Sequence, residues 1–211
     1  QFLLPWGVAL ADDGSVFVVE NGNRRVQRFD ADGRFLGTWG APGTGEGQFN
    51  SPAGIAVRPD GTVYVADTEN HRIQFFSPEG YYLGAIGSFG SAPGQFRSPG
   101  GTALGPDGSL FVADTLNHRV QHFSAVGQVL AVWGAYGGGP GDFDSPEGVA
   151  VAADGTVFVA DTGNHRIQRF EADGRPLGEW GAPGDGAGQF NSPSGLAIAP
   201  EAPEFAAANL A

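Results

Sequence analysis

Residues 65–76 read VADTENHRIQFF, and nearly the same sequence returns at 112–123 as VADTLNHRVQHF and at 159–170 as VADTGNHRIQRF. A looser copy, VVENGNRRVQRF, occupies residues 18–29. One asparagine marks the period of 47 residues in all four copies, at Asn23, Asn70, Asn117 and Asn164. A fixed period of about 40–50 residues indicates an array built from one supersecondary unit. Each motif must therefore first be understood as part of that unit.

Each unit contains four short apolar runs separated by turn sequences. In the second copy the runs are residues 54–57, 62–67, 72–76 and 81–87. Asp60-Gly61 is a typical hairpin turn, and Gly80 offers the left-handed backbone conformation that a glycine bulge needs. Helices are disfavoured by 36 glycines and 15 prolines in 211 residues. The unit is therefore predicted to be a four-stranded antiparallel meander.

The predicted sheets need cover on both faces. The second run reads Val-Tyr-Val-Ala rather than alternating apolar and polar residues, and a lone meander is barely stable. Such sheets packed face to face around an axis form a β-propeller, whereas the coils of the runner-up architecture, a linear β-solenoid, are usually shorter. The fold class is thus predicted to be all-β, a propeller with innermost strands near 54–57, 101–104 and 148–151. The blades are expected at about 5–40, 52–87, 99–134 and 146–181.

The repeated pattern resembles a known family. Pro-x-Gly-Ile/Val-Ala-Val, followed by Asp-Gly-x-Val-Tyr/Phe-Val-Ala-Asp-Thr-x-Asn-His-Arg and Trp-Gly, is similar to the NHL repeat. The Asn-His-Leu signature of that repeat reads Asn-His-Arg three times and Asn-Arg-Arg once here. The resemblance covers about residues 2–200, and it implies six blades, the usual number in similar propellers. We therefore expect a single domain over 1–211 that is an open arc and a fragment of a six-bladed ring, with four full blades and part of a fifth at 193–207.

The repeated Asp-Thr-x-Asn-His-Arg sequence lies between the second and third predicted strands. Aspartate and asparagine side chains hydrogen-bond to local backbone in turns, and the arginine can fork onto the aspartate five residues before it. We therefore expect this motif to stabilise the turn. Its residues are Asp67, Asn70, Arg72, Asp114, Asn117, Arg119, Asp161, Asn164 and Arg166.

Two patterns suggest metal sites but have simpler explanations. Aspartate and histidine of the turn motif could form a ring of ligands, but equivalent positions in neighbouring blades lie about 10 Å apart, whereas zinc ligands approach to about 2 Å. The sequences DADG at 30–33 and EADG at 171–174 look like calcium loops, but SPEG and SAVG replace them in the other copies, as expected of turns. No metal and no cofactor is expected.

Ligand contacts are expected where the copies differ, because the repeated residues build the scaffold. In a propeller, the turns between the second and third strands share one end with the linkers between blades. The position between the repeated proline and glycine should open on the central channel at this end, and it holds Trp6, Ala53, Gly100, Glu147 and Ser194. The candidates for ligand contact, taken from this position and from the linkers, are Trp6, Arg97, Tyr136, Asp144 and Glu147.

The composition narrows the function classes. A net charge of −12 disfavours contact with nucleic-acid phosphates, and no apolar run approaches the length of a membrane span. There is no cysteine for disulfide or thiol chemistry, and all 11 basic residues are arginine, which is typical of GC-rich bacterial genomes. Localisation stays open.

The favoured function is a non-catalytic binding scaffold that presents the inter-blade loops and the turns between strands two and three to a protein, peptide or carbohydrate. One alternative is a metal-dependent enzyme of the lyase or lactonase type, which related propellers include, with its site at the channel mouth. Such a site needs several His, Asp or Glu side chains, and only Glu147 and nearby Asp144 break the repeat there. The other alternative is the RNA binding of some animal NHL propellers, but the arginines form no cluster in the sequence.

Overall fold

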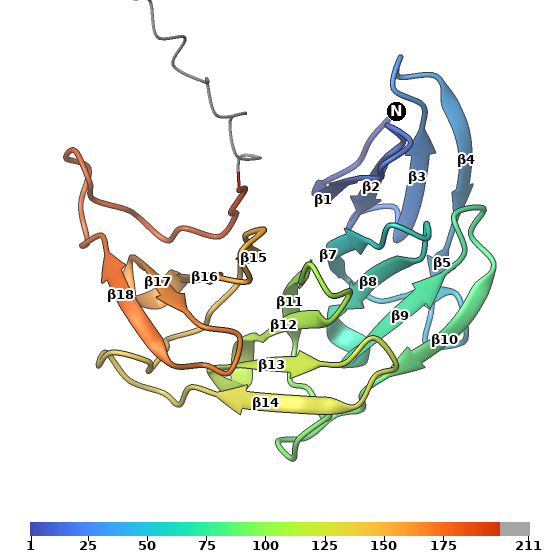
Figure 1. The fold of residues 1–211 in the computed structure, drawn as a ribbon. Helices are drawn as coiled ribbons and strands as arrows, with labels where there is room; N and C mark the ends of the chain where they lie inside the picture. Colours follow the sequence, from blue (N-terminus) through green and yellow to red (C-terminus); the bar gives the residue numbers. More distant parts are fainter. Residues whose placement is uncertain (199–211) are drawn as a thin grey trace, which may run out of the picture.

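The structure, a computed structural model, describes residues 1–198 as four antiparallel sheets of four strands each around an open arc (Figure 1). The first two sheets contain β1 (Pro5–Leu10), β2 (Val16–Glu20), β3 (Arg25–Phe29), β4 (Phe35–Trp39), β7 (Pro52–Val57), β8 (Val63–Asp67), β9 (Arg72–Phe76) and β10 (Tyr82–Ile86). The other two contain β11 (Pro99–Leu104), β12 (Leu110–Asp114), β13 (Arg119–Phe123), β14 (Val129–Trp133), β15 (Val149–Val151), β16 (Val157–Asp161), β17 (Arg166–Phe170) and β18 (Pro176–Trp180).

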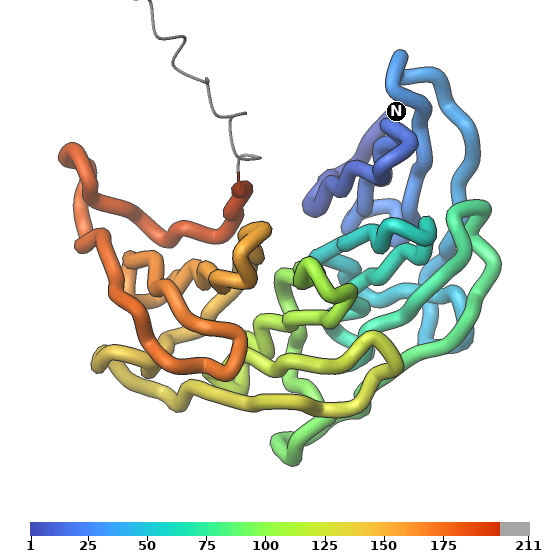
Figure 2. The backbone as a smooth tube through the Cα atoms, in the orientation of Figure 1, coloured from blue at the N-terminus to red at the C-terminus, as the bar shows by residue number. Residues whose placement is uncertain are grey.

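Within each sheet the strands are hydrogen-bonded in sequence order, from the inside of the arc to its rim. The strands β1, β7, β11 and β15 line the inside (Figure 1), and the tube in Figure 2 shows the chain returning from the rim to the inside after each sheet. Glycine makes the tight returns between strands, because its missing Cβ permits positive φ. Gly61 has φ 87° between β7 and β8, and Gly80 has φ 92° between β9 and β10.

Linkers carry the chain from one sheet to the next, and each closes on itself by a short parallel pairing. In the first linker β5 (Ala41–Pro42) pairs with β6 (Gln48–Phe49), a pairing that the sequence pattern does not predict. Single bridges take its place later, between Phe89 and Phe96, Tyr136 and Phe143, and Pro183 and Phe190. The turns after β8, β12 and β16 form the short 3₁₀ helices η1 (Thr68–Asn70), η2 (Thr115–Asn117) and η3 (Thr162–Asn164).

Neighbouring sheets pack through apolar side chains from both. Between the first two sheets, Phe17, Val19 and Val26 on one side meet Val63 and Phe76 on the other, and all five side chains are fully buried. Burying a side chain of this size contributes roughly 1.5–3 kcal/mol. Every residue of β8 and of β12 is buried, so both faces of the second strand are covered in a middle blade.

The predicted all-β propeller fold is confirmed, and the arc is open between β1 and the last described residues (Figure 1). Residues 193–198 contain no regular element, and the rest of the expected fifth blade lies outside the described residues. The number of blades in a closed ring stays a prediction. Within the described part of the chain, no helix is long and apolar enough to cross a membrane.

The innermost strands approach so closely that only glycine fits between them. A Cβ on Gly101 would lie 2.5 Å from the carbonyl oxygen of Glu147, and the Gly101 N–H donates a hydrogen bond to that same oxygen at 2.6 Å. Gly54 and Gly148 meet the backbone of their next neighbours in the same way. The inside of the arc therefore has a surface made largely of backbone.

Gly101→Ala should lower the free energy of unfolding by about 1–3 kcal/mol, because the added methyl group forces the backbones of β11 and residue 147 apart. Denaturant unfolding of the purified chain measures this. Gly37→Ala is the matched control, since a Cβ at Gly37 in β4 meets nothing within 4 Å. Equal losses in both variants would contradict the close approach.

Candidate functional site

A buried aspartate organises the turn between the second and third strands of each blade. Asp67 is 0% exposed, and its Oδ2 accepts hydrogen bonds from Arg72 Nε at 2.8 Å, Gln74 Nε2 at 2.9 Å and Asn70 Nδ2 at 2.9 Å. The backbone N–H of Asn50 donates to Oδ1 at 2.7 Å. We call Asp67, Asn70, Arg72 and Gln74, with their equivalents in other blades, the turn staple. Both oxygens are satisfied, as a buried charge requires.

The turn staple recurs in every blade. Arg119 Nε lies 2.7 Å from Asp114, and Arg166 Nε lies 2.7 Å from Asp161. In the first blade Glu20 takes the place of the aspartate, with Arg25 Nε at 2.5 Å. Burial acts to raise the pKa of Glu20, but the hydrogen bond from Arg25 and those from neighbouring groups outweigh it, so the pKa lies below its ordinary value.

The staple arginine also ties the turn to the linker that enters its blade. Arg119 donates from its terminal nitrogens to the carbonyl oxygens of Ser91, Ala92 and Gln95, at 2.7, 3.0 and 2.8 Å. Only Nε meets Asp114, so the arginine does not fork onto the carboxylate as the sequence suggested. The sequence-based prediction of the turn motif did not include the glutamine. Its 47-residue period was nevertheless visible at Gln27, Gln74, Gln121 and Gln168.

The repeated histidines hold the following linker. Their Nδ1 atoms accept the backbone N–H groups of Ser98, Ser145 and Ser192 at 3.0–3.1 Å, and the histidines are His71, His118 and His165. Each histidine therefore links its turn to the backbone of the next linker, and His118 Nδ1 also lies 3.7 Å from Asp144 Oδ1.

At the end of the arc that carries the turns between the second and third strands, its inside forms a groove of about 630 Å³. We call it the mouth groove. The innermost strands contribute its floor, and the turns at Thr68–Glu69 and Thr115–Leu116 contribute its wall. The position between the repeated proline and glycine lines it in every copy, with Trp6, Ala53, Gly100, Glu147 and Ser194.

Trp6 and Glu147, two of the five predicted contact residues, line the mouth groove. Trp6 is 66% exposed and lies at the irregularity between Pro5 and Gly7, where the pairing of β1 with β2 shifts its register. Glu147 is half-buried, and burial raises the pKa of its carboxyl group above the ordinary value.

Two threonines line the groove with Glu147 and differ from the other copies, Thr115 in its hydrogen bonding and Thr102 in its residue type. Thr68 and Thr162 donate to the carbonyl oxygens of Pro99 and Pro193, both at 2.8 Å. Their equivalent Thr115 has a buried Oγ1 with no hydrogen-bond partner among residues 1–198, as does Thr102. Buried polar atoms are nearly always paired in proteins, so this part of the groove is chemically distinct from its copies.

Arg97 and Asp144 do not line the groove. Their backbone groups are used locally: each N–H donates to the staple aspartate at 2.7 Å, and each carbonyl accepts from the turn, Leu116 N at 3.0 Å and Gly163 N at 2.8 Å. The Arg97 side chain is exposed. Asp144 Oδ1 accepts a hydrogen bond from Ser145 Oγ at 3.0 Å.

Tyr136, predicted from the sequence as a ligand contact, packs against one of the repeated histidines. Its ring packs against His118 at 4.9 Å, and Phe89, one repeat earlier, packs against His71 at the same distance. Tyr136 is 72% exposed and lies outside the mouth groove. Its position therefore belongs to the repeated scaffold.

Glu69 and Leu116 line the groove but were not chosen from the sequence. The signal was present, because the variable residue of the Thr-x-Asn turn is Gly22, Glu69, Leu116 and Gly163 in the four copies. Leu116 is 45% exposed. Sequence variation marked the position, and only the fold shows that it faces the channel.

No group of three or more His, Cys, Asp or Glu side chains within residues 1–198 is placed to hold one metal ion. The DADG and EADG sequences form the turns before β4 and β18. In the first, Asp30 Oδ1 accepts the backbone N–H groups of Asp32 and Arg34 at 3.0 and 2.8 Å, as a turn aspartate does.

The family model of the NHL repeat matches residues 2–29, 49–76, 96–123 and 143–170. Among curated proteins no match to this chain was found. Several solved structures share its fold. A streptogramin B lyase is 17% identical with a TM-score of 0.66, over 84% of this chain and 54% of that chain.

A gluconolactonase from Xanthomonas campestris is 21% identical with a TM-score of 0.66, over 90% of this chain and 64% of that chain. A chain of the nidogen/laminin complex is 18% identical with a TM-score of 0.61, over 83% and 62% of the two chains. This chain thus spans less than two thirds of each, and identities this low show a shared propeller fold alone.

Arg119→Ala should lower the free energy of unfolding by about 1–3 kcal/mol, because Asp114 loses a charged donor and three linker carbonyls lose theirs. Thermal or denaturant melts measure this. Arg97→Ala, in the linker that Arg119 holds, removes an exposed guanidinium and should leave the melt unchanged. If Arg119→Ala melts like the wild type, the arginines are not structural.

Glu147→Gln should raise the melting temperature at neutral pH. A carboxyl group whose pKa is raised in the folded state takes up a proton that the unfolded chain does not, so stability falls as pH rises through that window. Gln carries no such penalty. The difference between variant and wild type should vanish below pH 4.5, the ordinary pKa, and a difference independent of pH would contradict the burial of this group.

Proposed function

This chain belongs to the NHL-repeat family, and we propose that it is a non-catalytic binding scaffold whose mouth groove takes a protein segment, a peptide or a carbohydrate. The observation that carries the proposal is the gathering of departures from the repeat in one groove. Glu147, Leu116 and the hydroxyl group of Thr115, which is unpartnered within the described residues, lie where the third and fourth blades meet, and Trp6 lies at the other side.

The groove offers three kinds of contact to a ligand. Its floor is backbone, whose N–H and C=O groups can pair with a polar chain. Leu116 and Trp6 are exposed apolar side chains at 45% and 66%, and an aromatic ring with a polar edge suits either a peptide or a sugar. Glu147, with a pKa raised by burial, can donate a hydrogen bond when protonated and accept one when ionised.

The rigid scaffold supports this proposal. The turn staples fix the groove-lining turns to the linkers, so the groove is formed before any ligand arrives, and a preformed site avoids the cost of ordering loops on binding. Among proteins of the same fold, the nidogen/laminin complex is itself an association of proteins. For this chain, the class of ligand is a proposal.

A metal-dependent lyase or lactonase with its site at the same mouth is the second candidate, because a streptogramin B lyase and a gluconolactonase share the fold. It requires ligands that converge on one ion with an open position for water. RNA is a third candidate, and it would need a basic patch on a chain with a net charge of −12.

Screening of the chain against peptide and glycan arrays, followed by titration of a hit, should give a ligand whose affinity falls at least tenfold in Trp6→Ala and in Leu116→Gly. Glycine is the residue that two other copies carry at position 116, so the turn should still fold. Tyr81→Ala, which removes an exposed ring outside the groove, should bind like the wild type. A hit unaffected by both groove variants would contradict the proposed site.

The enzyme alternative is tested separately. The chain is incubated with Zn²⁺, Mn²⁺ or Ca²⁺, then analysed for bound metal and assayed for opening of lactone and depsipeptide esters. We expect no turnover and no stoichiometric metal. One metal per chain that is lost in Glu147→Gln, together with turnover lost in the same variant, would replace the binding scaffold with the enzyme.

A further inference from the structure

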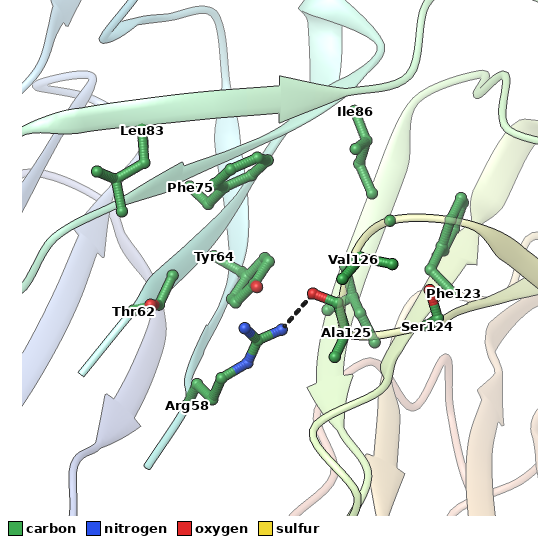
Figure 3. Close-up of a pocket in the computed structure, with 12 residues that line it drawn as sticks. Arg58, Thr62, Tyr64, Phe75, Leu83, Ile86, Phe123, Ser124, Ala125 and Val126 are labelled. Atoms are coloured by element: carbon green, nitrogen blue, oxygen red, sulfur yellow. Dashed lines mark hydrogen bonds between the residues drawn. The ribbon is translucent and has the colours of Figure 1, made fainter. Parts of the chain in front are cut away.

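A second hollow lies between the second and third blades, away from the mouth groove. It has a volume of about 250 Å³, and Figure 3 shows Arg58, Tyr64 and Phe75 on one side facing Val126 and Phe123 on the other. We call it the junction pocket.

The junction pocket exists because one large residue of the repeat is missing. The last strand of the other blades ends in Trp39, Trp133 and Trp180, but β10 ends in Ile86. At the neighbouring junctions the tryptophan fills the space, because a Cβ on Gly80 would lie 2.7 Å from Trp39 and one on Gly174 would lie 2.5 Å from Trp133. The smaller Ile86 leaves that space open beside Phe123.

Four more departures from the repeat line the same pocket. Arg58 stands where the other copies have Ala11, Gly105 and Ala152. Tyr64 stands in place of phenylalanine, Phe75 in place of arginine or histidine, and Val126 in place of an acidic residue. A single change of this kind would be a packing defect. Because Ile86 and these four residues all line one pocket, we interpret the pocket as a binding site.

The pocket has an apolar body and a cationic rim. Tyr64 and Phe75 pack with ring centroids 5.7 Å apart, and Leu83, Ile86 and Val126 complete the apolar wall (Figure 3). The guanidinium of Arg58 lies 5.1 Å from the Tyr64 ring centroid. Replacing an acidic residue by Val126, which is 81% exposed, removes a negative charge from the rim.

Arg58 is held in place and keeps donors free. Its Nη2 donates to the carbonyl oxygens of Ala125 at 3.0 Å and Gly108 at 3.2 Å, which bridges the two blades. Nε is buried and has no hydrogen-bond partner among residues 1–198, so Nη1 is the donor that a ligand can reach. Nη1 has only the half-exposed Asp60 at 3.9 Å, a distance too long for a hydrogen bond. Burial raises the pKa of Tyr64, so its hydroxyl group stays protonated at neutral pH.

We propose that the junction pocket binds a small organic carboxylate with an apolar body, such as an arylalkanoic acid, whose carboxylate meets Arg58. Its volume equals about eight water molecules in the liquid and lies just below the usual range for ligand sites, roughly 300–1,000 Å³. That size suits a single ring with a short acidic chain. Arginine is the residue best matched to a carboxylate, and the ring would pack between Phe75 and Phe123.

The test uses 3-phenylpropanoate and its neutral amide with the whole chain, by isothermal titration and ligand-observed NMR. The carboxylate should bind with a dissociation constant of about 1 mM or tighter, and the amide at least tenfold more weakly. Ile86→Trp restores the tryptophan of the other blades, so it should fill the pocket, raise the melting temperature and abolish binding. Arg58→Ala restores the alanine of two copies, and it should remove the preference for the carboxylate.

A cavity without its arginine provides the control. In the double variant I86W/W133I the space moves to the next junction, where Gly105 replaces Arg58. This variant should show no preference for carboxylate over amide. The proposal is overturned if the wild type binds neither compound, if Ile86→Trp binds as the wild type does, or if the double variant keeps the wild-type preference. The remaining occupant of the junction pocket is then an apolar side chain of a partner protein.

Discussion

A carboxylate buried away from water must have its charge met by hydrogen bonds, and in each blade this requirement brings three separate segments together. Asp114 lies at the end of the second strand, Arg119 begins the third, and Arg119 in turn holds linker carbonyls that come from the previous blade. The charge therefore stabilises the turn and the register between blades at once. Breaking one pair would loosen the linker as well as the turn.

The same staples make the channel end of the arc rigid. The inner strands place few side chains there. Gly54, Gly101 and Gly148 allow the innermost backbones to touch, so few side chains fill the centre. Those that do enter the mouth groove come from positions free to vary, such as Glu147 and Leu116. The constant part of the repeat thus builds the walls, and the variable part sets what they present.

Several departures from the repeat meet in two places. One is the mouth groove, around Glu147 and the hydroxyl group of Thr115, which has no hydrogen-bond partner in residues 1–198. The other is the junction pocket, where Ile86 leaves the space that tryptophan fills elsewhere and Arg58 supplies a cation. Each blade packs only on its neighbours, so a change at one junction leaves the others intact. A repeat array can therefore change a single junction with little loss of overall stability.

The sequence by itself determined the fold, because a strict 47-residue period, paired turn signals and two apolar faces per sheet permit few arrangements. It also marked the proline-x-glycine position that lines the mouth groove. It could not show that the backbone N–H groups of Arg97 and Asp144 donate to the staple aspartates. Nor could it show that Tyr136 packs on a repeated histidine as Phe89 does. Only the tertiary structure decided which variable positions meet, since Arg58, Tyr64, Phe75 and Ile86 come from successive parts of one sheet and meet Val126 only when the next blade packs against that sheet.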